Sequence, residues 1–181
     1  VRAAAVIEEA DGRDTALAKL RTLVADEPDA DDLVRLIAAA IGIVAGEAPR
    51  EEVYRAVRRT LEVLAAKRPL VVVFDDLQWA ESTFLDLVEH LADWSRGAPI
   101  LVVALARPDL LDKRPTWGGG KLDAQTVLLE GLGEGDTRTL IGSLLGATPE
   151  PGLLRRVEEV SEGNPLFVEQ LVAMLVEEGH L

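Results

Sequence analysis

Hydrophobic residues recur every three or four positions through the first 68 residues, with polar residues between them. This spacing predicts amphipathic helices over Asp14–Ala25, over the stretch that begins at Pro28, and over the stretch that follows Pro49. We also expect a short apolar helix over Val1–Ala10, which Asp11-Gly12 ends.

The pattern changes at Pro69, where two continuous apolar runs appear with an amphipathic stretch between them. The runs, 70–74 and 99–106, predict strands buried on both faces, and 82–95 predicts the helix that joins them as a parallel βαβ unit. Residues 126–129 predict a third, shorter strand. After Gly133 we expect three further helices, over about 134–145, 150–161 and 165–178.

These elements predict an α/β fold with a parallel sheet of three strands. A helical segment (1–68) would precede the α/β core (69–131), and a helical region (132–181) would follow it. On the helix over 82–95, we expect Trp94 to lie in the core and His90 to lie on the solvated face.

The charge balance and the composition exclude several classes of function. With 19 Lys and Arg against 32 Asp and Glu, the formal net charge is −13, which disfavours direct binding to nucleic acid or to an anionic membrane surface. The absence of cysteine excludes disulfides and thiolate metal sites. We find no apolar run long enough to span a bilayer and no signal peptide, so we expect a cytoplasmic protein.

Charged residues follow both predicted core strands. The first run ends in Asp75-Asp76 and the second in Arg107, and reactive groups of open α/β sheets gather at the carboxyl ends of strands. An apolar strand followed by two acids is the Walker B pattern of P-loop nucleotide hydrolases. In that interpretation Asp75 holds Mg²⁺, usually through water, Asp76 orients the attacking water, and Arg107 senses the γ-phosphate. The alternative is that the two acids only cap a strand and solvate a loop.

Three segments in order carry a resemblance to a known family. Residues 75–81 (DDLQWAE), 104–111 (ALARPDLL) and 163–169 (GNPLFVE) resemble the Walker B, sensor 1 and lid motifs of the AAA-like STAND ATPases, the signal-transduction ATPases with numerous domains. Members often have His where Gln78 stands and Asp where Glu81 stands, two departures at positions not expected to touch phosphate. The resemblance implies a regulatory switch domain that binds and hydrolyses ATP with Mg²⁺, within a signalling or transcriptional regulator.

The resemblance also implies partners and further site residues. The other domains of such a polypeptide would be a class III nucleotide cyclase or a LuxR-type helix-turn-helix, with tetratricopeptide repeats. In the helical lid (132–181) Asn164 and Pro165 would contact the nucleotide, with Pro165 against the adenine. Locally, Gly163 suits a left-handed helix end, Asn164 an N-cap and Pro165 the first helical position. The rival hypothesis is a non-catalytic scaffold module of the same fold.

A Walker A loop, G-x-x-x-x-G-K-[ST], is missing from the sequence. At the only Gly-Lys pair, Gly120-Lys121, the first required glycine falls on Pro115, and Leu122 replaces the Ser or Thr. We therefore interpret this glycine-rich loop as a flexible connector. We expect the chain to be a fragment that begins inside the helical segment between the second and third core strands of the family, and so to lack the first two strands.

The expected loss of two strands would leave hydrophobic strand edges unpaired. Such edges recruit other strands, because unmet backbone groups and bare apolar surface are both costly. We therefore expect either that the strand at 99–106 pairs with the one at 126–129, or that the chain self-associates.

The isolated 181-residue chain should bind ATP negligibly, because it lacks the backbone amides and the lysine that cradle phosphates. Titration calorimetry with ATP and Mg²⁺ measures this. A dissociation constant of a few micromolar or tighter would show that the phosphate site has been misplaced.

Overall fold

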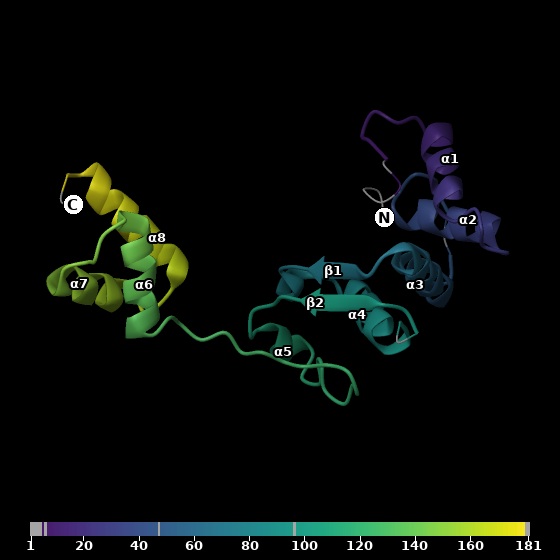
Figure 1. Ribbon diagram of the computed structural model, residues 1–181. Helices are drawn as coiled ribbons and strands as arrows, with labels where there is room; N and C mark the ends of the chain where they lie inside the picture. Colours follow the sequence, from purple (N-terminus) through teal and green to yellow (C-terminus); the bar gives the residue numbers. More distant parts are fainter. Residues whose placement is uncertain (1–4, 6, 47, 96, 180–181) are drawn as a thin grey trace. The chain divides into compact units, whose positions relative to one another are not determined.

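The computed structural model describes every residue except 1–4, 6, 47, 96 and 180–181. The chain divides into two compact units, Val1–Gln125 and Thr126–Leu181, whose elements Figure 1 labels. Each unit is described by itself below.

Three helices open the first unit, as the periodicity predicts. They are α1 (Arg13–Leu23), α2 (Ala30–Ala40) and α3 (Arg50–Lys67). Their inward faces form one hydrophobic cluster, whose buried members include Leu20, Leu33, Leu36, Ile37 and Ala56.

The helix expected over Val1–Ala10 is wrong for the residues that the structure describes. Ala5 and residues 7–10 lie in turns and irregular chain, and the other positions of that expected helix are outside the described residues. Ala5 and Ile7 nevertheless pack on the cluster formed by α1 to α3. The apolar pattern therefore correctly indicates that these residues are buried or partly buried, but not that they form a helix.

The sheet of the first unit has two parallel strands, β1 (Leu70–Phe74) and β2 (Ile100–Ala104), with α4 (Ser82–Trp94) between them in the chain. The register pairs Leu70 with Ile100 and Phe74 with Ala104. A short 3-10 helix, η1 (Leu77–Trp79), follows β1, and a single helical turn, α5 (Leu110–Lys113), follows β2. The predicted strand–helix–strand unit is confirmed.

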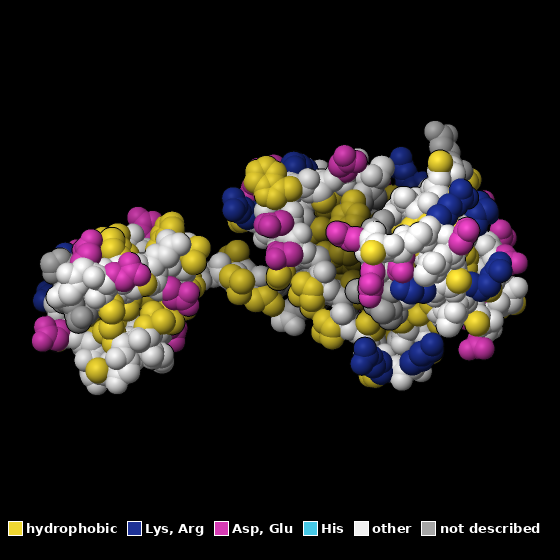
Figure 2. Space-filling view, turned by 90° about the horizontal axis from the view of Figure 1, so that it is seen from above, with side chains coloured by type: hydrophobic (Ala, Val, Ile, Leu, Met, Phe, Trp, Pro, Cys, Tyr) yellow, Lys and Arg dark blue, Asp and Glu magenta, His cyan; other side chains and the backbone are white. Residues whose placement is uncertain are grey.

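Only one face of this sheet is covered by the described residues of the first unit. Leu85 and Val88 of α4 are buried in one cluster with Phe74 and Val102 of the strands. On the opposite face Val71, Val73 and Leu101 are each between 57% and 59% exposed, and Figure 2 shows hydrophobic side chains gathered on the surface of this unit. The expectation of strands buried on both faces is therefore wrong for the described residues of the first unit, in which no helix covers the second face.

The third strand expected at Thr126–Leu129 is also wrong. These residues have no regular secondary structure, and Val127, Leu128 and Leu129 are 68–84% exposed. The sheet has two strands in the described structure, and the expected pairing of 99–106 with 126–129 is absent from it. A threonine followed by three apolar residues does not form a strand unless a neighbouring strand satisfies its backbone groups.

Two expectations for α4 are wrong as well. Trp94 remains 67% exposed, although it continues the spacing of the buried Leu85, Val88 and Leu91 to the last residue of the helix. The His90 ring lies between the rings of Tyr54, 5.7 Å away, and Trp94, 6.2 Å away. Burial first, and then the nearby charge of Arg58, lowers the pKa of His90. His90 thus belongs to the contact between α3 and α4.

The second unit contains three helices, α6 (Glu134–Leu145), α7 (Pro151–Ser161) and α8 (Pro165–Glu177). The sequence predicted all three to within one residue at each end. Their hydrophobic cluster is built on Ile141, Leu154, Val157, Val168 and Val172. Across the described residues of both units, none of the helices combines the length and the hydrophobicity that crossing a bilayer requires.

Replacing Leu85 tests the packing of α4 beneath the strands. Leu85 is 2% exposed, so Leu85→Ala should lower the free energy of unfolding by about 2–5 kcal/mol, from lost burial and the cavity left behind. Urea unfolding followed by circular dichroism measures the loss. Leu111→Ala is the matched control, because Leu111 is 50% exposed, and an equal loss in both variants would contradict the packing described here.

Candidate functional site

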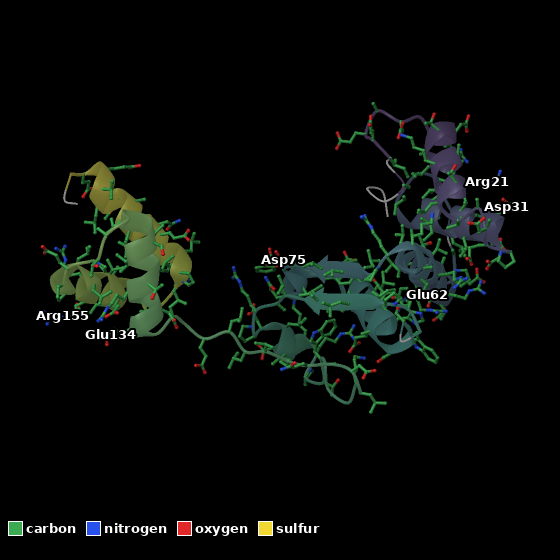
Figure 3. All side chains as sticks on the ribbon, in the orientation of Figure 1. Arg21, Asp31, Glu62, Asp75, Glu134 and Arg155 are labelled. Atoms are coloured by element: carbon green, nitrogen blue, oxygen red, sulfur yellow. The ribbon has the colours of Figure 1, made fainter. Side chains whose placement is uncertain are left out.

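The ends of β1 and β2 lie side by side because the two strands are parallel and in register. Backbone hydrogen bonds continue beyond the strands: the N–H of Leu105 donates to the carbonyl of Phe74 at 2.8 Å, and the N–H of Leu77 donates to the carbonyl of Leu105 at 3.1 Å. Asp75 and Asp76 therefore leave the sheet beside the segment that leads to Arg107, and Figure 3 shows Asp75 at this end of the strands.

Asp76 has an uncommon backbone conformation for a residue other than glycine. Its φ of 55° and ψ of 36° are left-handed, which costs about 1–3 kcal/mol unless the surroundings impose it. The N–H of Asp76 donates to Oδ1 of Asp75 at 2.8 Å, and its carbonyl accepts the N–H of Trp79 at 3.0 Å. The turn lets the chain leave β1 and enter η1 within two residues.

Gln78 connects the two strand ends through its side chain. It is only 2% exposed, its Nε2 donates to Oδ1 of Asp76 at 2.8 Å, and its Oε1 accepts the backbone N–H of Arg107 at 3.1 Å. Its backbone carbonyl accepts Nζ of Lys113 at 2.5 Å. Sequence reasoning missed this residue and treated it as a tolerated departure. The available signal was a lone amide two positions after the acids, between the hydrophobic Leu77 and Trp79.

The side chains of Asp75 and Arg107 are exposed and open to a ligand. Asp75 accepts the N–H of its neighbour and keeps its second carboxylate oxygen free, while among the described residues no carboxylate pairs with Arg107. The described residues contain no group of three or more side chains that could hold a metal ion. A single carboxylate still fits Mg²⁺, which retains several of its waters and takes one or two protein ligands in phosphate sites.

Ion pairs fasten the chain after β2 to α4. The Arg114 guanidinium donates to Oδ1 of Asp86 at 2.6 Å and to the carbonyl of Ser82 at 2.9 Å. Lys121 donates to both carboxylate oxygens of Asp93 at 2.8 Å, and Trp117 packs on the cluster of Leu85 and its neighbours. The glycine-rich loop at 118–120 is therefore held to α4 by contacts before and after it, and it is not the flexible connector that the sequence predicted. The lysine that follows it, Lys121, is paired with the carboxylate of Asp93.

The second unit holds the other two candidate residues, Asn164 and Pro165. Oδ1 of Asn164 accepts the N–H of Leu166 at 3.0 Å, and Pro165 occupies the first position of α8, so the predicted N-cap and helix start are confirmed. Gly163 has the predicted left-handed conformation, with φ 75°, and follows Glu162 at φ 49°. The contact of Pro165 with an adenine stays a prediction.

Gly163 also lies against the segment that enters α6. The N–H of Leu132 donates to the carbonyl of Gly163 at 2.7 Å, and a Cβ on Gly163 would meet the carbonyl oxygen of Leu132 at 2.6 Å. The close approach and the positive φ together explain why glycine stands at this joint.

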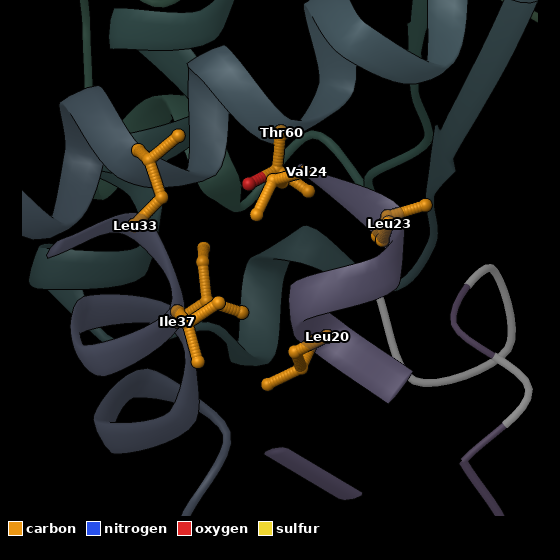
Figure 4. A pocket seen from close by; sticks show the side chains of 7 residues that line it. Leu20, Leu23, Val24, Leu33, Ile37 and Thr60 are labelled. Carbon is orange, nitrogen blue, oxygen red and sulfur yellow. The ribbon is translucent and has the colours of Figure 1, made fainter. Parts of the chain in front are cut away.

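A narrow pocket between α1, α2 and α3 carries no recognisable chemistry (Figure 4). Its only polar lining side chain is Thr60, whose hydroxyl donates to the carbonyl of Ala56 within its own helix at 2.8 Å. The rest of the lining is aliphatic, so we interpret it as a packing gap: Leu20, Leu23, Val24, Leu33, Val34 and Ile37.

Comparison with known proteins supplies a family. The model of the AAA ATPase domain family matches residues 3–103, more than half of the chain, and the match includes β1, the two acids and most of β2. An uncharacterized protein of Rhizobium meliloti (strain 1021) is 31% identical over 134 residues, which cover 69% of this chain and 12% of that protein. No solved structure matches the chain.

Changing Gly163 tests the joint before α8. Gly163→Ala should lower the free energy of unfolding by about 1–3 kcal/mol, because the added Cβ meets backbone atoms and the positive φ disfavours alanine. Circular dichroism during urea unfolding measures it. Gly152→Ala is the control, since Gly152 lies in α7 with open space at its Cβ, and alanine there should be neutral or stabilising. Equal stability of the two variants would count against the close approach.

Proposed function

Because the chain belongs to the AAA ATPase domain family, we propose that it is a fragment of the ATP-binding and ATP-hydrolysing switch domain of a multidomain signalling or transcriptional regulator of the STAND type. One observation carries the proposal: two adjacent acids leave β1 beside the segment after β2 that carries Arg107, whose guanidinium pairs with no carboxylate among the described residues. In nucleotide hydrolysis such groups act by position and charge, which requires a rigid support like this sheet.

In this proposal each residue has a distinct task. Asp75 holds the magnesium ion, directly or through water, with the carboxylate oxygen that the chain leaves free. Asp76 orients and polarises the attacking water through Oδ2, because Oδ1 is occupied by Gln78. Arg107 stabilises the charge that develops on the γ-phosphate. Magnesium-bound ATP supplies the reactive phosphoryl group.

The proposed adenine contact lies in the second unit. Pro165 offers an apolar ring at the start of α8, and Asn164 fixes that start by capping the helix. We propose that Pro165 packs on the adenine of the bound nucleotide.

The length of the matching relative supports the proposal that the chain belongs to a multidomain protein. The chain spans 12% of the length of the curated relative that it matches. We propose that the phosphate-binding loop belongs to another part of the same ATPase domain and that other domains of the polypeptide supply the output. The rival hypothesis, a scaffold module that does not hydrolyse ATP, is an outcome of the experiment below.

Asp76→Asn in the full-length protein should lower the single-turnover rate of ATP hydrolysis by on the order of 10²-fold, with nucleotide affinity nearly unchanged. The amide keeps the size of the carboxylate but loses the charge that polarises water. Rapid-quench hydrolysis and nucleotide titration measure the two quantities separately.

Asp75→Ala completes that experiment, because it should weaken binding of ATP in the presence of Mg²⁺ more than binding without it. Asp123→Asn, an exposed acid outside the strand ends, is the control for lost negative charge. Unchanged hydrolysis in Asp76→Asn would remove Asp76 from catalysis, and no hydrolysis by the unmodified protein would favour the scaffold.

A further inference from the structure

The Gln78 side chain is buried yet touches both proposed catalytic segments. A buried primary amide is costly unless its donor and its acceptor are both paired. Here the two partners are the carboxylate of Asp76 and the backbone N–H of Arg107, which is 29 positions away in the chain. One rigid, planar group therefore spans the gap between the ends of β1 and β2.

The direction of this linkage follows from chemistry. A backbone N–H can only donate, so the atom of Gln78 that faces Arg107 must be the oxygen, and the amide nitrogen must then face Asp76. A carboxylate accepts that N–H in a charge-assisted bond, which is stronger than a bond between neutral groups. The linkage fixes Oδ1 of Asp76 and leaves Oδ2 for water.

Holding the sheet together does not require this side chain. The strand ends are already joined by the backbone bonds from Leu105 to Phe74 and from Leu77 to Leu105. The bonds of Gln78 lie beyond that ladder and reach the two residues to which we assign catalysis. Lys113 also holds the backbone of Gln78 in place by donating to its main-chain carbonyl.

We propose that Gln78 is a positioning residue, which sets the carboxylate of Asp76 and the backbone of Arg107 in one arrangement so that the acid and the arginine act on the same phosphate. This inference rests on the proposed function for its effect on hydrolysis. The linkage itself rests only on the hydrogen bonds described above.

Two substitutions separate the two ends of the linkage. Gln78→Glu keeps an oxygen that can accept from Arg107, but in its ionised form it replaces the N–H donated to Asp76 with a second carboxylate oxygen that repels Oδ1 of Asp76. Gln78→Met keeps a similar shape and removes both hydrogen bonds. Gln125→Glu, at an exposed position of the same unit, is the control for added charge.

The first measurement needs no nucleotide. In the 181-residue chain, amide hydrogen exchange at Arg107, followed by NMR, should accelerate about tenfold in Gln78→Met and stay within about twofold of the unmodified chain in Gln78→Glu, since one net hydrogen bond is worth about that factor. Unchanged exchange in Gln78→Met would overturn the linkage.

The second measurement is steady-state ATP hydrolysis by the full-length protein. Both variants should lose at least about tenfold in kcat while KM for ATP changes less than about threefold, the pattern of a defect in the reacting geometry rather than in binding. An unchanged kcat in both variants, or unfolding of both below the assay temperature, would overturn the positioning role. If the unmodified protein hydrolyses no ATP, the proposed function fails, and exchange at Arg107 still decides whether the linkage exists.

Discussion

The parallel, in-register pairing of β1 with β2 is the constraint on which the candidate site depends. Parallel strands need a crossover, and α4 provides it while burying the face of the sheet that it contacts. The same pairing brings both strand ends to one edge, where the chain must turn away without leaving buried backbone groups unpaired. The left-handed Asp76 and the short helix η1 satisfy that need, and so place an acid at the edge.

The spacing of apolar residues was sufficient to predict the helices and strands that carry their own apolar face or apolar run. The helices α1, α2, α3, α4, α6, α7 and α8 and the strands β1 and β2 were all predicted, because each carries an apolar face or a long apolar run. The failures share one physical cause. Whether Thr126–Leu129 pairs, and whether Val71 and Leu101 are covered, depends on which other segments are present beside them, and no local pattern contains that information.

For the candidate site, the sequence predicted which residues lie at the strand ends, but not the hydrogen bonds that join them. Asp75, Asp76 and Arg107 could be found because strand ends in parallel sheets meet at one edge. Gln78 could not, since a glutamine in a turn is usually solvated, and only the tertiary placement of Arg107 gives its amide a second partner. The lid residue Asn164 was predictable as a cap because its partner is two positions away.

The backbone hydrogen bond from Leu132 to Gly163 also limits where insertions or deletions can occur in the chain without breaking contacts. It makes residues 131–132 part of the helical unit, while the ion pair of Lys121 with Asp93 fixes the other side. The intervening residues 122–130 are exposed and form no helix or strand. Insertions or deletions there would alter the reach between the two units and leave the hydrogen bonds of each intact, so natural variation in linker length should concentrate between these two anchors.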